Sequence, residues 1–177
     1  MIISISGSPG SGKSTAAKRV AEQLGMKFYS MGDLRGERAL ARGLTINEFN
    51  NLPEDTDTDV DQYVKKLGQG QDNFVIDSRL AWHFIPQSFK IFIKVDPRVG
   101  AERVMQGTRK DEPTHGSVDD TMRALAEREQ GDQKRYKRLY EVDHLDLSHY
   151  DLVIDSSHTG KETVVSQILD ALPSPRV

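Results

Sequence analysis

The eight residues from position 7 to position 14, Gly-Ser-Pro-Gly-Ser-Gly-Lys-Ser, carry the clearest chemical signal in the sequence. Their spacing matches G-x-x-x-x-G-K-[ST], the pattern of a phosphate-binding loop between a strand and a helix. Glycines let the backbone curl so that N–H groups point at phosphate oxygens, and the following helix adds its positive N-terminus. Lys13 would reach the β- and γ-phosphates, and the Ser14 hydroxyl would bind Mg²⁺. The predicted nucleotide-binding residues are Gly7, Ser8, Pro9, Gly10, Ser11, Gly12, Lys13, Ser14 and Thr15.

A regulatory GTPase would need more than this loop. It would carry an Asn-Lys-x-Asp segment that reads guanine, and the sequence contains none. The segment from Asp33 to Gly36 fits a loose Asp-x-x-Gly pattern, but four residues with two unspecified positions carry little information. The pattern therefore favours a different class of nucleotide-binding protein.

Arg128, Asp132 and Arg135 form a second group with chemical potential. Their spacing of four and three residues places them on one face of a helix. Two guanidinium groups flanking a carboxylate suit a phosphate with a ribose hydroxyl beside it. A ladder of salt bridges within the helix is the structural alternative.

Asp77 stands at the end of an apolar run, where ligands bind in open parallel sheets. Its carboxylate could hold Mg²⁺ through water, and Arg79 would then face the phosphate of an acceptor. The alternative for Asp77 is a cap for the next helix.

Short apolar runs alternate with helical patterns along the whole chain. Strands are predicted at 2–6, 27–29, 74–77, 90–95 and 151–155. Helices are predicted after the phosphate loop to Gly25, at 33–42, at 46–52 behind a Thr45-x-x-Glu48 capping box, up to about 67, from Asp96-Pro97 onward, up to about 140, and at the end of the chain. This order predicts an α/β fold: a five-stranded parallel sheet with helices on both faces.

Length and composition limit the remaining classes. At roughly 100–200 residues per domain, a chain of 177 residues is predicted to form a single domain, 1–177. The absence of cysteine excludes disulfides, thiolate zinc sites and a cysteine nucleophile. A net charge of −3 disfavours a nucleic acid polymer as partner. No signal peptide or long apolar run is present, so we expect a cytoplasmic protein without membrane contact. As a separate expectation, the protein works as a monomer.

Four segments resemble the cytidylate kinases of the small, archaeal-type form, within the P-loop nucleoside monophosphate kinases. They are the phosphate loop, Ser30-Met31-Gly32 with the following helix up to Phe49, the strand end Val75-Ile76-Asp77-Ser78-Arg79-Leu80, and the pair formed by Arg128-Glu129-x-x-Asp132-x-x-Arg135-Tyr136 and Asp146-Leu147-Ser148 to Asp155. The resemblance implies a P-loop kinase with a small acceptor-binding lobe at about 31–70 and a lid at about 106–117.

The resemblance also implies roles for individual residues. The residues that would stabilise charge during transfer are Lys13, Arg79, Arg109, Arg128 and Arg135. The residues that would bind the acceptor are Ser30, Gly32, Arg35, Arg38, Arg79, Asp132 and Arg135. The residues that would bind the metal ion are Ser14 and Asp77. Asp132 would bind the acceptor ribose. Arg103 would lie against the ATP base, and Arg109 would lie in the lid.

Several positions depart from the family pattern. The arginine expected in an aromatic-Arg pair appears one place early, as Arg35 before Gly36, so either Arg35 or Arg38 would meet the acceptor phosphate. Leu80 stands where longer bacterial enzymes place a carboxylate. Trp82 is interpreted either as part of the acceptor-base pocket or as a core residue. The acidic stretch at 54–61 is interpreted as a solvated linker.

We therefore expect a kinase that uses ATP and Mg²⁺ to phosphorylate a small-molecule nucleotide, CMP or dCMP. Two alternatives remain. One is a P-loop kinase for another monophosphate or small metabolite, and the other is a nucleotide-binding regulatory module without transfer activity.

Overall fold

The computed structural model describes residues 1–50, 52, 58–107 and 116–173. Its five strands are β1 (Ile2–Gly7), β2 (Lys27–Ser30), β3 (Phe74–Asp77), β4 (Phe89–Lys94) and β5 (Leu152–Asp155). Its helices are α1 (Lys13–Leu24), α2 (Met31–Ala41), α3 (Ile46–Asn50), α4 (Thr58–Gly70), α5 (Ala81–Phe84), α6 (Pro97–Gln106), α7 (Val118–Tyr140), the 3₁₀ helix η1 (Leu147–His149) and α8 (Lys161–Ala171).

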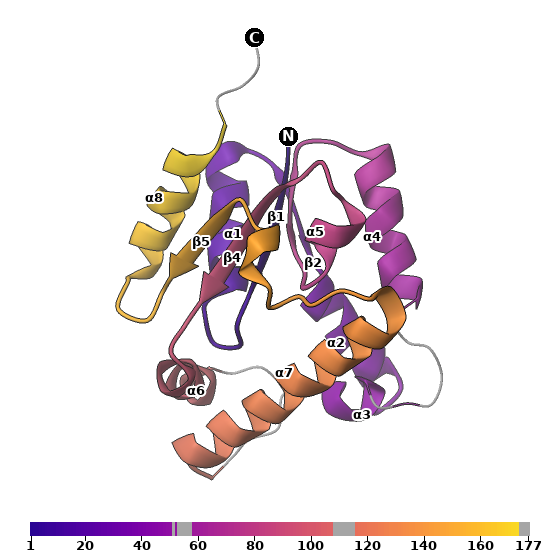
Figure 1. Cartoon of the computed structure of the whole chain (residues 1–177), viewed down its shortest axis with the longest axis vertical. Helices are drawn as coiled ribbons and strands as arrows, with labels where there is room; N and C mark the ends of the chain where they lie inside the picture. Colours follow the sequence, from indigo (N-terminus) through magenta and orange to yellow (C-terminus); the bar gives the residue numbers. More distant parts are fainter. Residues whose placement is uncertain (51, 53–57, 108–115, 174–177) are drawn as a thin grey trace.

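All five strands belong to one parallel sheet with the order β2-β3-β1-β4-β5 (Figure 1). Parallel strands end at the same edge, and the register aligns Asp77 with Ser30 on one side and with Ile5 on the other. The phosphate loop leaves the sheet at this edge, directly after β1. Figure 1 shows α3, α6 and α7 gathered at the end to which the strand arrows point.

Helices cover both faces of the sheet, as the sequence predicts. On one face, Ile3 and Ile5 of β1 pack with the buried sides of α1 and α8. On the other face, Phe74 and Ile76 of β3 pack with residues of α2, α4 and α5. Side chains alternate between the two faces along a strand, so Val75 of β3 packs on the first face while Phe74 and Ile76 pack on the second. Figure 1 shows α4 and α8 on opposite sides of the sheet.

Local capping signals fix several helix ends where the sequence predicts them. Gly25 ends α1 in the left-handed conformation (φ 62°). Thr45 and Glu48 form a reciprocal capping box, with the Thr45 N–H donating to the Glu48 carboxylate at 2.8 Å and the Glu48 N–H to the Thr45 hydroxyl at 3.2 Å. The two short helices α5 and η1 and the full length of α4 are not anticipated by the sequence reasoning.

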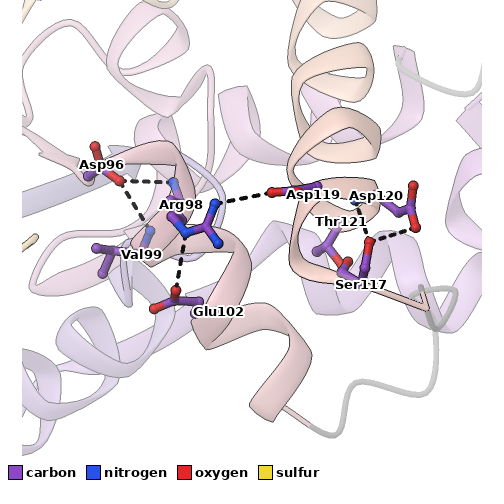
Figure 2. Close-up of polar contacts among 8 residues, drawn as sticks. All are labelled: Asp96, Arg98, Val99, Glu102, Ser117, Asp119, Asp120 and Thr121. Atoms are coloured by element: carbon purple, nitrogen blue, oxygen red, sulfur yellow. Dashed lines mark hydrogen bonds and ion pairs between the residues drawn. The ribbon is translucent and has the colours of Figure 1, made fainter.

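Two helices flank the predicted lid, and a polar network links their N-terminal ends (Figure 2). Asp96 caps α6 by accepting from the N–H groups of Arg98 and Val99. The Arg98 guanidinium then reaches Asp119 of α7 at 3.1 Å. Ser117 caps α7 by accepting from the N–H of Asp120 at 3.1 Å. The segment between these helices includes the predicted lid residue Arg109, which lies outside the described residues.

Within the described ranges, no helix is both long enough and apolar enough to cross a membrane.

Candidate active site

The phosphate loop follows the path that the glycine pattern predicts. Gly10 has φ 75° and Gly12 has φ 81°, a region that favours glycine. A Cβ atom on Gly10 would lie 2.2 Å from the backbone carbonyl oxygen of Gly100 in α6. Glycine at position 10 therefore satisfies both the backbone conformation and the close packing of the loop on α6.

Hydrogen bonds from neighbouring elements hold the loop. The Ser8 N–H donates to the Ile93 carbonyl of β4 at 3.0 Å. The Ser156 hydroxyl, just after β5, donates to the Ser11 carbonyl at 3.0 Å. Arg103 of α6 donates to the Ser156 carbonyl at 2.8 Å. The guanidinium of Arg103 thus binds Ser156, the residue that holds the loop. Arg103 also lines the cavity described below.

The loop ends beside a carboxylate. The Ser14 hydroxyl, in the first turn of α1, donates to the carboxylate of Asp77 at the end of β3. Asp77 is buried, and both residues line the cavity. Hydroxyl and carboxylate oxygens are the ligands that Mg²⁺ prefers, so this pair fits a magnesium ion bound with nucleotide phosphates. The cap interpretation of Asp77 has no support at α5, because the N-cap residue of that helix is Leu80 and the Leu80 N–H donates to the Ser78 hydroxyl at 3.3 Å.

A cavity of about 510 Å³ opens over the loop. Its wall includes many of the predicted residues: Pro9, Gly10, Gly12, Lys13, Ser14, Thr15, Gly32, Arg35, Asp77, Arg79, Arg103 and Arg128. The remaining lining residues are Met31, Asp33, Ile46, Val60, Asp61, Ser78, Leu80, Val104, Gly107 and Tyr136. Lys13 and four arginines from α2, the turn after β3, α6 and α7 therefore share one cavity, as phosphate binding would require.

Of the two candidate arginines on α2, Arg35 lines the cavity and Arg38 does not. The guanidinium carbon of Arg35 lies 5.8 Å from the centre of the Phe49 ring of α3. Ser30, at the end of β2, caps α2 by accepting from the Asp33 N–H at 3.1 Å. The departure at position 35 thus still leaves an arginine at the cavity wall.

Asp132 is the most deeply buried carboxylate of the predicted set, with 1% of its surface exposed. Arg135 donates to one of its oxygens at 2.7 Å, and the Arg79 guanidinium contacts the other. Arg79 comes from the turn after β3 and is itself held by Trp82, whose indole N–H donates to the Arg79 carbonyl at 3.0 Å. The contact between Asp132 and Arg79 shows that the group extends beyond a salt-bridge ladder within α7.

Electrostatics keep this cluster charged. Burial alone would raise the pKa of Asp132, but Arg79, Arg135 and Arg128 outweigh it and the pKa is lowered. Burial would likewise lower the pKa of Arg79, yet the carboxylate of Asp132 raises it above its ordinary value. For the neighbouring Glu129, burial dominates and its pKa is raised.

Trp82 and His144, two ring side chains near the site, are both buried. Trp82 is 7% exposed and stacks on His149 with ring centres 4.4 Å apart, so it belongs to the interior rather than to the cavity wall. His144 is also buried and meets the Tyr136 ring edge-on at 5.2 Å. Burial, together with Arg79, lowers the pKa of His144 to about 4.

Asp61 is a lining residue that the sequence reasoning missed. The interpretation of 54–61 as a solvated linker is wrong at this position. Asp61 lies in α4, is half-buried, and accepts a hydrogen bond from the Tyr140 hydroxyl at the end of α7. The apolar spacing of Val60, Val64 and Leu67 could have revealed that the helix begins before Asp61.

Comparisons with known proteins indicate the family and the fold. The profile of the family described as "AAA domain" matches residues 6–120. The chain is 38% identical over 175 residues to the cytidylate kinase of Methanocella arvoryzae, covering 97% of each chain. It is 34% identical over 181 residues to the cytidylate kinase of Archaeoglobus fulgidus, covering 100% of this chain and 97% of that one. The crystal structure of shikimate kinase from Aquifex aeolicus superposes with a TM-score of 0.61 at 24% identity, covering 97% and 95% of the two chains, which supports the fold alone.

Proposed function

The chain belongs to the cytidylate kinase family, and on that basis we propose that it transfers the γ-phosphate of ATP to CMP or dCMP, giving the nucleoside diphosphate and ADP. The observation that carries the proposal is the convergence of Lys13, Arg79 and Arg128 on one cavity from three different elements. Phosphoryl transfer requires little covalent chemistry, and catalysis rests on positioning and on stabilising charge.

The chain's own residues divide this work between the two substrates. The loop N–H groups and Lys13 would hold the ATP phosphates, with Arg128 reaching them from α7. Arg79 would face the acceptor phosphate, whose oxygen is already anionic, so no general base is needed. The predicted lid residue Arg109 would join from the segment between α6 and α7 and exclude water.

Ser14 and Asp77 would hold Mg²⁺, because their oxygens already meet at the cavity wall. The ion would supply positive charge to the β- and γ-phosphate oxygens. Asp77 would contribute its carboxylate from the end of β3, and Ser14 its hydroxyl from the end of the loop.

The acceptor would lie between α2 and the turn after β3. Ser30, Gly32, Arg35 and Arg38 belong to or adjoin α2, and we propose Arg35 as the arginine that meets the acceptor phosphate because it lines the cavity. Asp132 would bind the acceptor ribose while ordering Arg79 and Arg135. On the ATP side, Arg103 would contact the base from α6.

The wider setting is also part of the proposal. We expect one domain, 1–177, with an acceptor lobe at 31–70, working in the cytoplasm as a monomer on small-molecule nucleotides. The net charge of −3, with no excess of Lys and Arg over Asp and Glu, supports such a partner rather than a nucleic acid polymer.

The decisive experiment measures ADP release from MgATP with CMP, dCMP, UMP, AMP, GMP and shikimate, each beside a control without acceptor. Turnover that depends on CMP or dCMP and clearly exceeds the others is the expected result. Turnover led by another acceptor would leave the mechanism intact and overturn the named substrate. ATP binding without turnover on any acceptor would favour a regulatory module.

A further inference from the structure

We infer that Ser156 is a positioning residue for ATP, because its hydroxyl orients one peptide unit of the phosphate loop and, together with its own carbonyl, the guanidinium group of Arg103. The inference rests on the proposed function, which assigns the ATP phosphates to the loop and the ATP base to Arg103. Ser156 directly follows β5, is 2% exposed and is not among the residues that line the cavity. It would therefore act on the nucleotide through the residues that it holds.

The first contact of the Ser156 hydroxyl is with the phosphate loop. The hydroxyl oxygen lies 3.0 Å from the Ser11 carbonyl and 3.1 Å from the Lys94 carbonyl of β4, and it has one proton to donate. The Lys94 carbonyl also accepts from the Ser156 N–H at 2.9 Å, a bond that does not need the hydroxyl. We therefore assign the hydroxyl proton to the Ser11 carbonyl.

A fixed Ser11 carbonyl also orients the next N–H group of the loop. The Ser11 carbonyl and the Gly12 N–H belong to one planar trans peptide unit, in which the two groups point in opposite directions. With the carbonyl held toward Ser156, the Gly12 N–H points to the other side of the loop, and Gly12 lines the cavity. Successive N–H groups of such a loop are the donors that bind phosphate oxygens.

The second contact of Ser156 is with Arg103 of α6. One terminal nitrogen of Arg103 donates to the Ser156 hydroxyl at 3.2 Å, and the other donates to the Ser156 carbonyl at 2.8 Å. Two bonds from one planar group fix the orientation of its plane as well as its position. Both bonds use the edge of the guanidinium group, so its flat faces remain suited to stacking on a ring. Arg103 lines the cavity, where it could present such a face to the ATP base.

Ser156 is itself held by the sheet and by the start of α6. Its N–H is bonded to Lys94 of β4, as described above. The hydroxyl of the next residue, Ser157, accepts from the N–H of Asp96, the N-cap residue of α6, at 2.8 Å. The end of β5 is thus joined to β4 and to α6 on either side of Ser156. A hydroxyl on such a fixed backbone restricts the groups that bind it.

The test measures the dissociation constant of MgATP by calorimetry in the wild type and in Ser156→Ala. We expect the constant to rise about tenfold, in line with the loss of a hydrogen bond to a charged group. Ser88→Ala is the matched control. Ser88 is also a buried serine whose hydroxyl donates to a backbone carbonyl, that of Ile85 at 2.8 Å, but it precedes β4 at the opposite edge of the sheet. Ser88→Ala should leave the constant within about twofold of the wild type.

Steady-state kinetics separate a positioning role from a structural one. Ser156→Ala should raise KM for ATP about tenfold and leave KM for CMP within about twofold of the wild type. Ser156→Thr, which keeps the hydroxyl, is the second variant. It should bind MgATP within about threefold of the wild type, even where Ser156→Ala does not fold.

A double-mutant cycle tests the link between Ser156 and Arg103. Arg103→Ala removes the proposed contact with the ATP base and should also raise the dissociation constant of MgATP. If Ser156 acts partly through Arg103, Ser156→Ala has a smaller effect in the Arg103→Ala protein than in the wild type. Effects that multiply without any coupling would overturn the link to Arg103.

The outcomes distinguish the inference from the proposed function. A wild type that binds MgATP but turns over neither CMP nor dCMP would refute the proposed function, while calorimetry would still decide the role of Ser156. Unchanged MgATP affinity in Ser156→Ala would overturn that role. An equal rise of KM for ATP and for CMP would also overturn it, because that pattern indicates a structural effect. A Ser156→Thr protein with the wild-type melting temperature and tenfold weaker MgATP binding would do the same.

Discussion

The Ser14 hydroxyl donates a hydrogen bond to the Asp77 carboxylate, joining residues 63 positions apart in the sequence. Ser14 belongs to α1, the helix that follows the phosphate loop. Asp77 ends β3, the strand that lies beside β1 in the sheet. The two oxygen donors proposed for Mg²⁺ therefore meet through the fold itself.

Asp77→Asn should weaken Mg²⁺ binding while leaving the melting temperature of the protein close to that of the wild type. The amide oxygen is a poorer ligand for a hard cation than a carboxylate. The Mg²⁺ concentration for half-maximal turnover should rise about tenfold, measured by titrating MgCl₂ at fixed ATP. An unchanged midpoint, with the wild-type melting temperature, would remove Asp77 from the metal site.

Lys13→Ala should reduce kcat by about a hundredfold or more, because it deletes a positive charge aimed at the transferred phosphate. The fold should persist, because α1 contributes its buried side to the core through Ala16, Ala17 and Val20 rather than through Lys13. ADP release and circular dichroism measure the two effects. Unchanged turnover would refute the site assignment.

Gly10→Ala should damage both the loop and nucleotide binding. The new Cβ would meet the Gly100 carbonyl oxygen at 2.2 Å, and φ 75° disfavours a side chain. We expect a lower melting temperature and at least a tenfold loss of ATP affinity by calorimetry. Gly131→Ala is the control, because nothing lies within 4 Å of its added Cβ and alanine favours the exposed middle of α7 by about 1 kcal/mol.

Asp132→Ala should raise the KM for the acceptor far more than the KM for ATP. The substitution removes the proposed ribose ligand and releases Arg79 and Arg135 from their shared partner. It also removes the carboxylate shared by two half-buried guanidinium groups, so the free energy of unfolding should fall by about 3 kcal/mol. Equal weakening of both substrates in steady-state kinetics would contradict the acceptor role.

Stability should decline between pH 6.5 and about pH 4 because of His144. Its folded-state pKa of about 4 lies below the ordinary 6.5, so in this window the unfolded chain binds a proton that the folded protein excludes. Stability therefore rises with pH and is lost on acidification, by up to about 3 kcal/mol.

Denaturant unfolding at pH 7.5 and at pH 5 measures this decline. His144→Phe keeps an aromatic ring against Tyr136 but cannot bind a proton, so its stability should change less between the two pH values. Identical changes in the variant and the wild type would assign the acid sensitivity to other groups.

The sequence by itself determined the parts of this protein that depend on short-range patterns. The five strands, the capped start of α6 at Asp96 and the phosphate loop are each encoded within a few consecutive residues, because periodicity, capping and positive-φ glycines act locally. The alternation of strands and helices then limited the fold to a parallel sheet covered on both faces.

Only the tertiary structure decided which distant side chains meet. It placed Arg79 against Asp132, brought Arg35 rather than Arg38 to the cavity wall, and packed Trp82 inside against His149. It also joined Asp61 to Tyr140, residues 79 positions apart. Such contacts depend on the packing of helices on the sheet, whose angles and distances arise from many side chains together, and no local stretch of sequence encodes them.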